Sequence, residues 1–454
     1  MVSRRAPNER LRGLLKEAQW TGDALAKAVN VLAAEAGLSL RYQRPSVAQW
    51  LAGAVPRAPV PLLVAEAMSR RLGREVTAED AGFTGPDDSR KTGTAFGGED
   101  AGEVLHALAR LSEEASHKRD DSRLVYALTA VEEMSSEARS RTLWAAARPS
   151  GRRIGRAEVS SAEAMLQLLS SIEQTFGGGY VRTALATYLD TVIGPWLAAP
   201  SSPVVGRNIY SVAAKLSCLC GFVHFDDEQH GLGLHYYVSG LRLAASAEDD
   251  FTAAAVLRGL SVQAYTLGHR RQARWLAEGA ARRGSPQVPG HLRAAVMGQQ
   301  AVTAAAVGDR RVARDCLRLA ERWLDDSAIP LVPIGAYHLG SLAHQHGEVA
   351  LLLGDFQRAE SFLRTAIRQR PPYEGRSRAL ILHKLAVLQL SQGELDAACD
   401  SWHQFVKAST SVRSHRVESA VAEMRARLLP YANYSEAASV LRSVTSPGPM
   451  RKTV

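Results

Sequence analysis

Apolar residues near the N-terminus recur three and four positions apart, which is the spacing of one face of an α-helix. The pattern predicts a helix over residues 9–19, a second that begins after Thr21, a short third over residues 46–51 and a fourth over residues 60–72. Asn8 and Thr21 stand directly before the first two helices, where an N-cap side chain is needed. The residues predicted to face a common core are Leu11, Leu14, Leu15, Ala18, Leu25, Ala28, Val29, Leu32, Val47, Trp50, Leu51, Leu63, Ala67 and Leu72.

Small residues set a second pattern, which runs over residues 206–430. A turn residue is preceded by a small residue seven positions earlier and followed by another five positions later, and the set recurs at intervals of about 40 residues. The five sets are Gly221, Glu228 and Gly233; Ser261, Gly268 and Ala273; Ala301, Gly308 and Ala313; Gly347, Gly354 and Ala359; Ala386, Gly393 and Ala398. Antiparallel helices approach closely only where side chains are small, and a tight turn favours glycine because glycine tolerates positive φ. The pattern therefore predicts an array of helical hairpins.

This order of small residue, glycine and small residue resembles the tetratricopeptide repeat (TPR). The resemblance implies a C-terminal TPR-like α-solenoid, in which hairpins stack on their neighbours. The interval exceeds the usual length of about 34 residues, which longer helices would explain. Glu228 replaces the turn glycine of the first unit. Twelve positions after the turn, where the first four units have a further small residue, the final unit has Phe405. An alanine-rich helical bundle is the alternative, although a bundle does not require five copies in register.

Changes in composition divide the rest of the chain. We predict an N-terminal domain over residues 1–86, a flexible Gly- and Asp-rich linker over 87–100 and a helical connecting and capping segment over 101–205. Residues 431–454 are expected to form a C-terminal cap and tail. The three glycines at 177–179 predict a turn between helices over 160–176 and 180–193, a hairpin that would cap the first repeat. They do not predict a phosphate-binding loop, because no strand precedes them and no GK[ST] follows.

The overall composition indicates an all-α protein, with 46% hydrophobic and only 6% aromatic residues. No run of about 18 apolar residues could cross a membrane, and no apolar stretch follows the basic N-terminus as in a secretion signal. We therefore expect a cytoplasmic protein without a membrane partner. The four cysteines lack CxxC spacing and lie in apolar helical segments, which favours reduced core residues over a metal or redox site. They are Cys218, Cys220, Cys316 and Cys399.

Positive charge is concentrated at the N-terminus. The formal net charge is +9, and the first 74 residues hold twelve Lys or Arg against five Asp or Glu. An excess of this kind in one small segment is typical of a module that binds a polyanion.

The predicted third helix has the form of a DNA-recognition helix. Val47, Trp50 and Leu51 share an apolar face, which leaves Ser46 and Gln49 on the outside beside Arg44. Together with the Pro-rich break at 56–59 and the Leu-rich helix after it, the segment resembles the Xre (lambda repressor-like) helix-turn-helix domain. Its loop over residues 34–45 is longer than that of the family. The alternative is a helical cap on the array with a solvated basic face.

The Xre resemblance implies which side chains would meet duplex DNA. Tyr42, Gln43, Arg44, Ser46 and Gln49 would face the major groove, and Arg41 and Arg57 would hold phosphates.

Taken whole, the chain resembles actinobacterial regulators that join an Xre-type N-terminus to a tetratricopeptide array and control development or secondary metabolism. The stretches that carry this are FGGGY at 176–180, HGLGLHYY at 230–237 and GLRLA at 240–244. The resemblance implies a concave groove that binds a peptide or protein effector. The groove positions in the tetratricopeptide register are Lys215, Phe222, Phe225, Arg258, Tyr265, His344, Glu348, Leu380, His383 and Val387.

Catalytic motifs are absent from the sequence: it has no HExxH, GxSxG or Walker-type loop. We predict that the protein is not an enzyme and needs no cofactor or metal. Two hypotheses remain. One is a sequence-specific transcriptional regulator, for which the sequence leaves the oligomeric state undetermined and a homodimer is one option. The other is an interaction scaffold that sequesters a partner protein without useful DNA binding.

Overall fold

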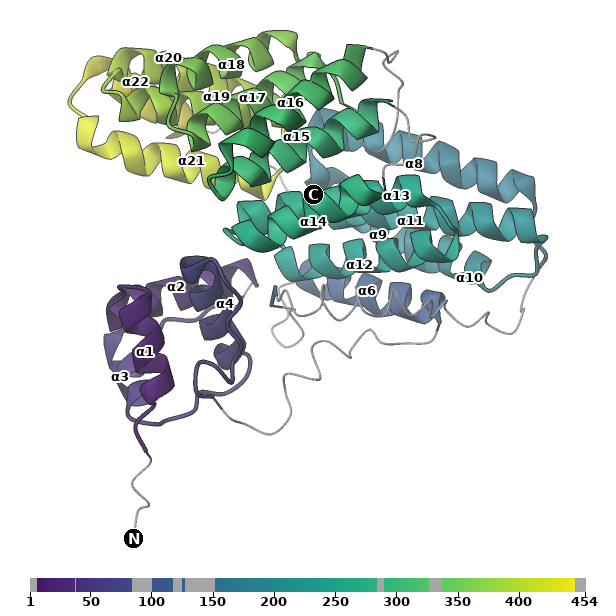
Figure 1. Cartoon of the computed structure of the whole chain (residues 1–454), viewed down its shortest axis with the longest axis horizontal. Helices are drawn as coiled ribbons and strands as arrows, with labels where there is room; N and C mark the ends of the chain where they lie inside the picture. The colour runs from purple at the N-terminus through teal and green to yellow at the C-terminus, as the bar shows by residue number, and fades with distance from the viewer. Residues whose placement is uncertain are drawn as a thin grey trace. The chain divides into compact units, whose positions relative to one another are not determined.

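The computed structural model describes residues 6–36, 38–83, 100–116, 125–126, 152–283, 290–325 and 337–445. Within these residues every regular element is helical, and consecutive helices pack as solenoid-like pairs (Figure 1). The predicted all-α fold is therefore confirmed. The predicted linker at 87–99 and the tail beyond residue 445 lie outside the described residues.

Four helices form the N-terminal domain: α1 (Glu9–Glu17), α2 (Gly22–Glu35), α3 (Arg44–Leu51) and α4 (Val60–Leu72). Asn8 accepts a hydrogen bond from the Leu11 N–H at 2.9 Å and Thr21 accepts one from the Ala24 N–H at 3.2 Å, which confirms both predicted N-caps. Helix α3 starts two residues earlier than predicted, because Pro45 is already suited to the first turn of a helix. The predicted inward residues form one hydrophobic core, to which Val76, Ala81 and Phe83 are added from beyond α4.

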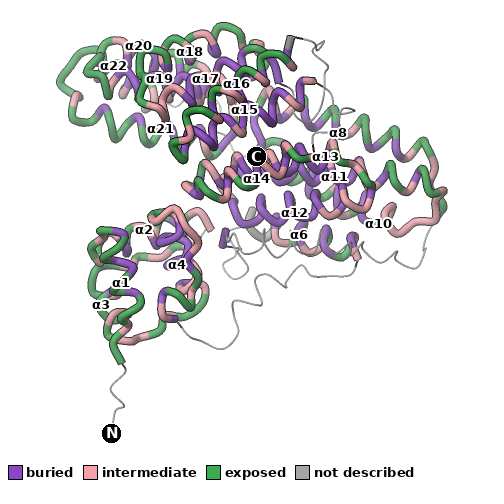
Figure 2. Tube along the Cα trace, viewed as in Figure 1, coloured by how far each residue is buried: buried purple, intermediate pink, exposed green. Residues whose placement is uncertain are grey.

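The chain divides into two compact units. The first comprises Met1–Glu163, Thr183–Phe225 and Gln229–Leu276, and the second comprises Ala164–Arg182, Asp226–Glu228 and Ala277–Val454. In the first unit α6 (Ala101–Ser116) packs against α12 (His230–Ser246), with Leu105 and Leu108 fully buried. Figure 2 shows α12 buried along most of its length.

The segment before the repeats differs from its prediction. Helix α8 (Arg156–Phe176) ends at the glycines as expected, but the helix predicted over 180–193 runs on to Leu197. It consists of α9 (Arg182–Tyr188), a π-helical turn over Leu189–Ile193 and α10 (Gly194–Leu197). Pro195 does not stop the helix because it occupies the first turn of α10, where no hydrogen-bonded N–H is needed.

The predicted hairpins are present as six helix pairs. Their helices are α11 (Pro203–Asp226) and α12; α13 (Asp250–Thr266) and α14 (Arg270–Arg282); α15 (Gly290–Ala306) and α16 (Arg310–Asp325); α17 (Leu339–Leu352) and α18 (Phe356–Gln369); α19 (Gly375–Ser391) and α20 (Leu395–Ser409); α21 (His415–Leu428) and α22 (Ser435–Thr445). All five predicted turn residues have positive φ, including Glu228 at 57°. Helices of 17 residues, such as α13, α15 and α19, account for the long interval.

The small residues lie where the helices of a pair meet. A Cβ on Gly221 would come within 2.8 Å of the Tyr237 ring, and a Cβ on Gly259 of α13 would come within 2.6 Å of the same ring. Ser261 Oγ donates to the Ala273 carbonyl at 2.7 Å, so α13 and α14 are also in close contact. The spacing read from the sequence thus corresponds to helix crossings.

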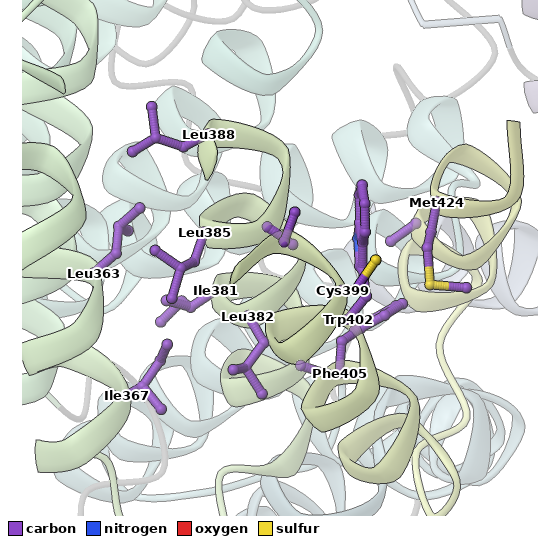
Figure 3. Close-up of a cluster of buried hydrophobic side chains, with 14 of the residues drawn as sticks. Leu363, Ile367, Ile381, Leu382, Leu385, Leu388, Cys399, Trp402, Phe405 and Met424 are labelled. Atoms are coloured by element: carbon purple, nitrogen blue, oxygen red, sulfur yellow. The ribbon is translucent and has the colours of Figure 1, made fainter. Parts of the chain in front are cut away.

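The last repeats share one hydrophobic core, drawn in Figure 3. Phe405, which replaces the expected small residue, is fully buried there beside Trp402. In Figure 3 both rings point toward Met424 of α21. The bulky ring is tolerated because the neighbouring hairpin is the last one, and its helices pack around the ring.

In the described part of the chain, no helix is both long and apolar enough to cross a membrane. None of the four cysteines forms a disulfide and all are buried, and burial raises the pKa of Cys218 to about 12. The prediction that they are core residues is confirmed.

Candidate nucleic-acid interface and inner face of the repeats

Helix α3 has an apolar back and a polar front. Val47 and Trp50 are buried in the domain core, whereas Arg44 and Gln49 are exposed. The Trp50 ring lies edge-on to Phe83, with centroids 6.5 Å apart, which fixes the buried side of the helix. The packing of Trp50 therefore fixes the orientation of α3, with Arg44 and Gln49 toward solvent.

The chain that leads into α3 is held by Asn30, a contact that the sequence reasoning missed. Asn30 accepts from the Tyr42 N–H through Oδ1 and donates from Nδ2 to the Tyr42 carbonyl, both at 2.8 Å. The Tyr42 ring packs edge-on against Trp50 at a centroid distance of 5.1 Å and is partly buried. A polar residue at an inward position of α2 was the only signal for this contact.

Several basic side chains of this domain already have acidic partners. Ion pairs join Arg12 to Glu9, Lys27 to Asp23, Arg74 to Glu17, and Arg70 to both Glu35 and Glu66. Among the described residues, no carboxylate lies within ion-pair distance of the exposed Arg41, Arg44 or Arg57. Of the other predicted contact residues, Gln43 is exposed and Ser46 is partly buried. Arg41, Arg44 and Arg57 are thus exposed charges beside α3 without an acidic partner among the described residues.

A buried carboxylate of α4 contacts the turn between α13 and α14. His269 Nε2 lies 2.9 Å from Glu66 Oε1, and Arg70 Nε lies 2.8 Å from the same oxygen. The Tyr126 ring stacks on the His269 ring with centroids 5.5 Å apart. Burial raises the pKa of Tyr126 well above its usual value, with Glu66 adding to the effect, so its hydroxyl remains neutral.

The first helices of later pairs carry a chain of charged side chains. Glu348 of α17 contacts Lys384 of α19 and lies 3.6 Å from the His344 ring. Burial alone would raise the pKa of Glu348, but Lys384 and His344 outweigh it, so that the pKa lies well below its usual range. Burial lowers the pKa of His344, against the opposing effect of Glu348. The sequence placed His344 and Glu348 at groove positions, and the structure brings them together.

His383 of α19 is held in one tautomer. The indole N–H of Trp402 can only donate, and it lies 3.3 Å from Nδ1 of His383. Nε2 therefore carries the hydrogen and donates it to Glu423 of α21 at 3.1 Å. Burial lowers the pKa of His383, which favours this neutral form. In the described residues, no three His, Cys, Asp or Glu side chains come close enough together to hold a metal ion.

The predicted groove positions in the first unit are mostly not open. Lys215, Phe222, Arg258 and Tyr265 are partly buried. Phe225 is fully buried, with its ring 5.8 Å from the His230 ring, so the expectation that it lines a groove is wrong. The repeat register counts positions along α11, but α12 begins only a few residues later and covers that face. Leu380 and Val387 of α19 pack against the core of the second unit.

A buried cluster of charges in the second unit was not foreseen. Arg376 pairs with Glu173 and lies 3.7 Å from Asp226, while Asp227 pairs with Arg182 at 2.8 Å. Burial raises the pKa of Asp226 to about 6. These residues are distant in sequence, so no local pattern could indicate that they meet.

The glycines at 177–179 allow close contact between the end of α8 and the segment before α21. The Arg413 N–H donates to the Phe176 carbonyl at 2.7 Å, and the Gly179 N–H donates to the Arg413 carbonyl at 3.1 Å. A Cβ on Gly177 would come within 2.4 Å of that carbonyl oxygen. The glycines are therefore needed for close approach to the segment before α21, in addition to the turn that was predicted. Glu228 is also involved, since its carboxylate accepts from Ser419 Oγ at 2.8 Å.

The N-terminal part of the chain is similar to a known protein family. Residues 11–84 match the family model described as the SP15 N-terminal domain, a segment that contains nearly all of α1 to α4. No family model matches for the Xre or tetratricopeptide resemblance. No curated protein matches the chain.

Proposed function

We propose that the protein is a sequence-specific DNA-binding transcriptional regulator. The observation that carries the proposal is the set of exposed arginines beside α3, Arg41, Arg44 and Arg57, which have no acidic partner among the described residues. A cation that lacks an internal partner is available to a phosphate or to the edge of a guanine.

Helices α2 and α3 would act as a helix-turn-helix of the Xre type. Arg44 and Gln49 are exposed on α3 while Val47 and Trp50 are buried, and Gln43 is exposed at the N-cap of the helix; amide and guanidinium groups can read bases. The loop of residues 36–43 is long for this class, but Asn30 holds its last part in place through both hydrogen bonds to Tyr42. Tyr42 would then support α3 from within more than it reads bases.

The repeats would bind a peptide or protein effector that alters DNA affinity or dimer formation. Lys384, Glu348, His344 and Glu423 give the first helices of the second unit a pattern of alternating charge, which suits recognition of a polar, extended segment. Control of development or secondary metabolism is the role that the actinobacterial resemblance implies.

The test uses the full-length protein and a random-sequence duplex library. Selection should enrich one motif, and Arg44→Ala and Gln49→Ala should each weaken binding to it by about tenfold or more, since a bidentate base contact contributes about 1–3 kcal/mol. Lys27→Ala is the matched control, because this exposed lysine of the same domain is paired with Asp23. A library that returns no preferred sequence would favour the interaction scaffold instead.

A further inference from the structure

Helix α16 presents an arginine surface to solvent that the proposed function does not use. Every exposed side chain described in this helix is an arginine except Glu321. The exposed arginines are Arg310, Arg311, Arg314, Arg318 and Arg322. The opposite side of α16 is buried through Ala313, Cys316, Leu317 and Ala320, so the arginine face has a fixed direction.

Only part of this charge is neutralised within the protein. Asp315 contacts Arg318 and lies 3.9 Å from Arg311. Arg310 and Arg314 have no carboxylate within ion-pair distance in the part of the chain whose side chains are described. Like charges four residues apart destabilise a helix. Apart from a hydrogen bond from Arg314 Nε to the Arg310 carbonyl at 3.3 Å, no polar contact of these two arginine side chains is found in the described residues.

Glu321, an exposed acidic residue of α16, already has a partner. Glu321 lies 3.0 Å from Nε2 of His346 in α17, and the His346 ring stacks on Phe362 of α18 at 4.7 Å. His346 therefore connects α16 to α18. Helix α18 also carries two exposed arginines, Arg368 and Arg364, of which Arg364 pairs with Glu360 at 2.8 Å.

We propose that the arginine face of α16 binds the phosphate backbone of duplex DNA, as a second contact surface outside the N-terminal domain. Arg310, Arg314, Arg318 and Arg322 follow one another every four residues and extend about 18 Å along the helix axis. Duplex DNA of that length carries about ten phosphates. Guanidinium groups bind phosphate oxygens in pairs, which favours arginine over lysine at such a surface.

The chemistry of the face argues against other partners. None of its exposed side chains is apolar, whereas the centre of a protein interface and a membrane-bound helix both need apolar residues. The contact would be independent of sequence, because phosphates carry no base information. The inference rests on the proposed function, because that function makes DNA the polyanion. It concerns different residues from those of the N-terminal domain.

The experiment measures binding of the full-length protein to a random-sequence duplex across a series of salt concentrations. Arg310→Gln/Arg314→Gln removes two charges and keeps good helix formers. Lys407→Gln/Arg425→Gln removes two exposed charges from α20 and α21 and is the matched control. We expect the α16 variant to bind about tenfold more weakly at low salt and to lower the slope of log K against log salt by about 2, with the control unchanged.

Equal behaviour of the two variants would overturn the inference, as would wild-type protein that fails to bind random duplex at low salt. The same variants are compared on polyglutamate and on vesicles containing phosphatidylglycerol. An α16 effect confined to either of these would replace DNA by an acidic protein or a membrane. Arg44→Ala separates the two proposals: it should abolish preference for the selected motif while leaving the α16 effect on random duplex intact.

Discussion

His269 and Glu66 lie 2.9 Å apart in a contact that joins the turn after α13 to a helix of the N-terminal domain. Both side chains are nearly inaccessible to water, and Arg70 binds the same carboxylate oxygen. A buried carboxylate held by two partners connects these segments through electrostatics as well as packing.

Removal of this carboxylate should loosen α4. We expect Glu66→Ala to lower the free energy of opening α4, measured by hydrogen exchange, by about 3 kcal/mol, because Arg70 and His269 would lose a buried partner. Glu79→Ala, at an exposed position of the same domain, should change it by less than about 0.5 kcal/mol. Unchanged exchange in Glu66→Ala would mean that the contact does not stabilise the domain.

Asp226 should make the second unit less stable as pH rises. Its pKa in the folded protein, about 6, is above the unfolded value, so the neutral form favours folding below pH 4 and this contribution is lost as pH rises through 6. Asp226→Asn should therefore raise the free energy of unfolding, measured with urea, by up to about 3 kcal/mol at pH 7–8 and leave it nearly unchanged at pH 4. Asp400→Asn, an exposed change in α20, serves as the control. A gain that is the same at both pH values would contradict the assigned pKa.

Glu348 should have the opposite dependence. Its pKa is depressed by Lys384 and His344 against the effect of burial, so its contribution is present above the unfolded pKa and is lost as pH falls below about 4. Glu348→Gln should destabilise the second unit at pH 7 and by a smaller amount near pH 3, because the contribution disappears fully only as pH falls through the depressed pKa of the folded protein. Urea unfolding at the two pH values measures this, with the exposed Glu163→Gln as control. Equal destabilisation at both would argue against an ionised Glu348.

The Tyr237 ring should make two glycines irreplaceable. Glycine to alanine inside a helix normally stabilises by about 0.5–1 kcal/mol, but a Cβ on Gly221 or Gly259 would collide with this ring. We expect each substitution to destabilise the first unit by about 1–3 kcal/mol in urea unfolding. Gly13→Ala is the control and should be stabilising, since a Cβ there meets nothing within 4 Å.

The repeats were predictable because their geometry depends on local sequence. A turn needs a residue that accepts positive φ, and a helix crossing needs a small one, so Gly354 and Ala359 reveal both at fixed spacing. The N-terminal helices were predictable for a similar reason, since Asn8 and Thr21 are local caps. The prediction was wrong at Pro195. A proline can follow the end of a helix or lie in the first turn of one, and the sequence alone did not distinguish these cases.

The candidate sites were less predictable. Exposure of Arg44 and Gln49 followed from the periodicity of α3, but Phe225 was misplaced because its burial depends on α12. The pairing of Arg376 with Glu173 joins residues that are 203 positions apart. Helical periodicity says which side of a helix faces inward, and it does not say what that side meets.

The turn at Glu228 limits what can be learned by averaging the repeats. A consensus of the five units would place glycine there and remove the strain of a positive φ at a residue with a Cβ. It would also delete the carboxylate that binds Ser419, 191 positions away. Substitution of glycine at Glu228, to match the other units, would thus remove a hydrogen bond to α21, and engineering of this array should keep Glu228.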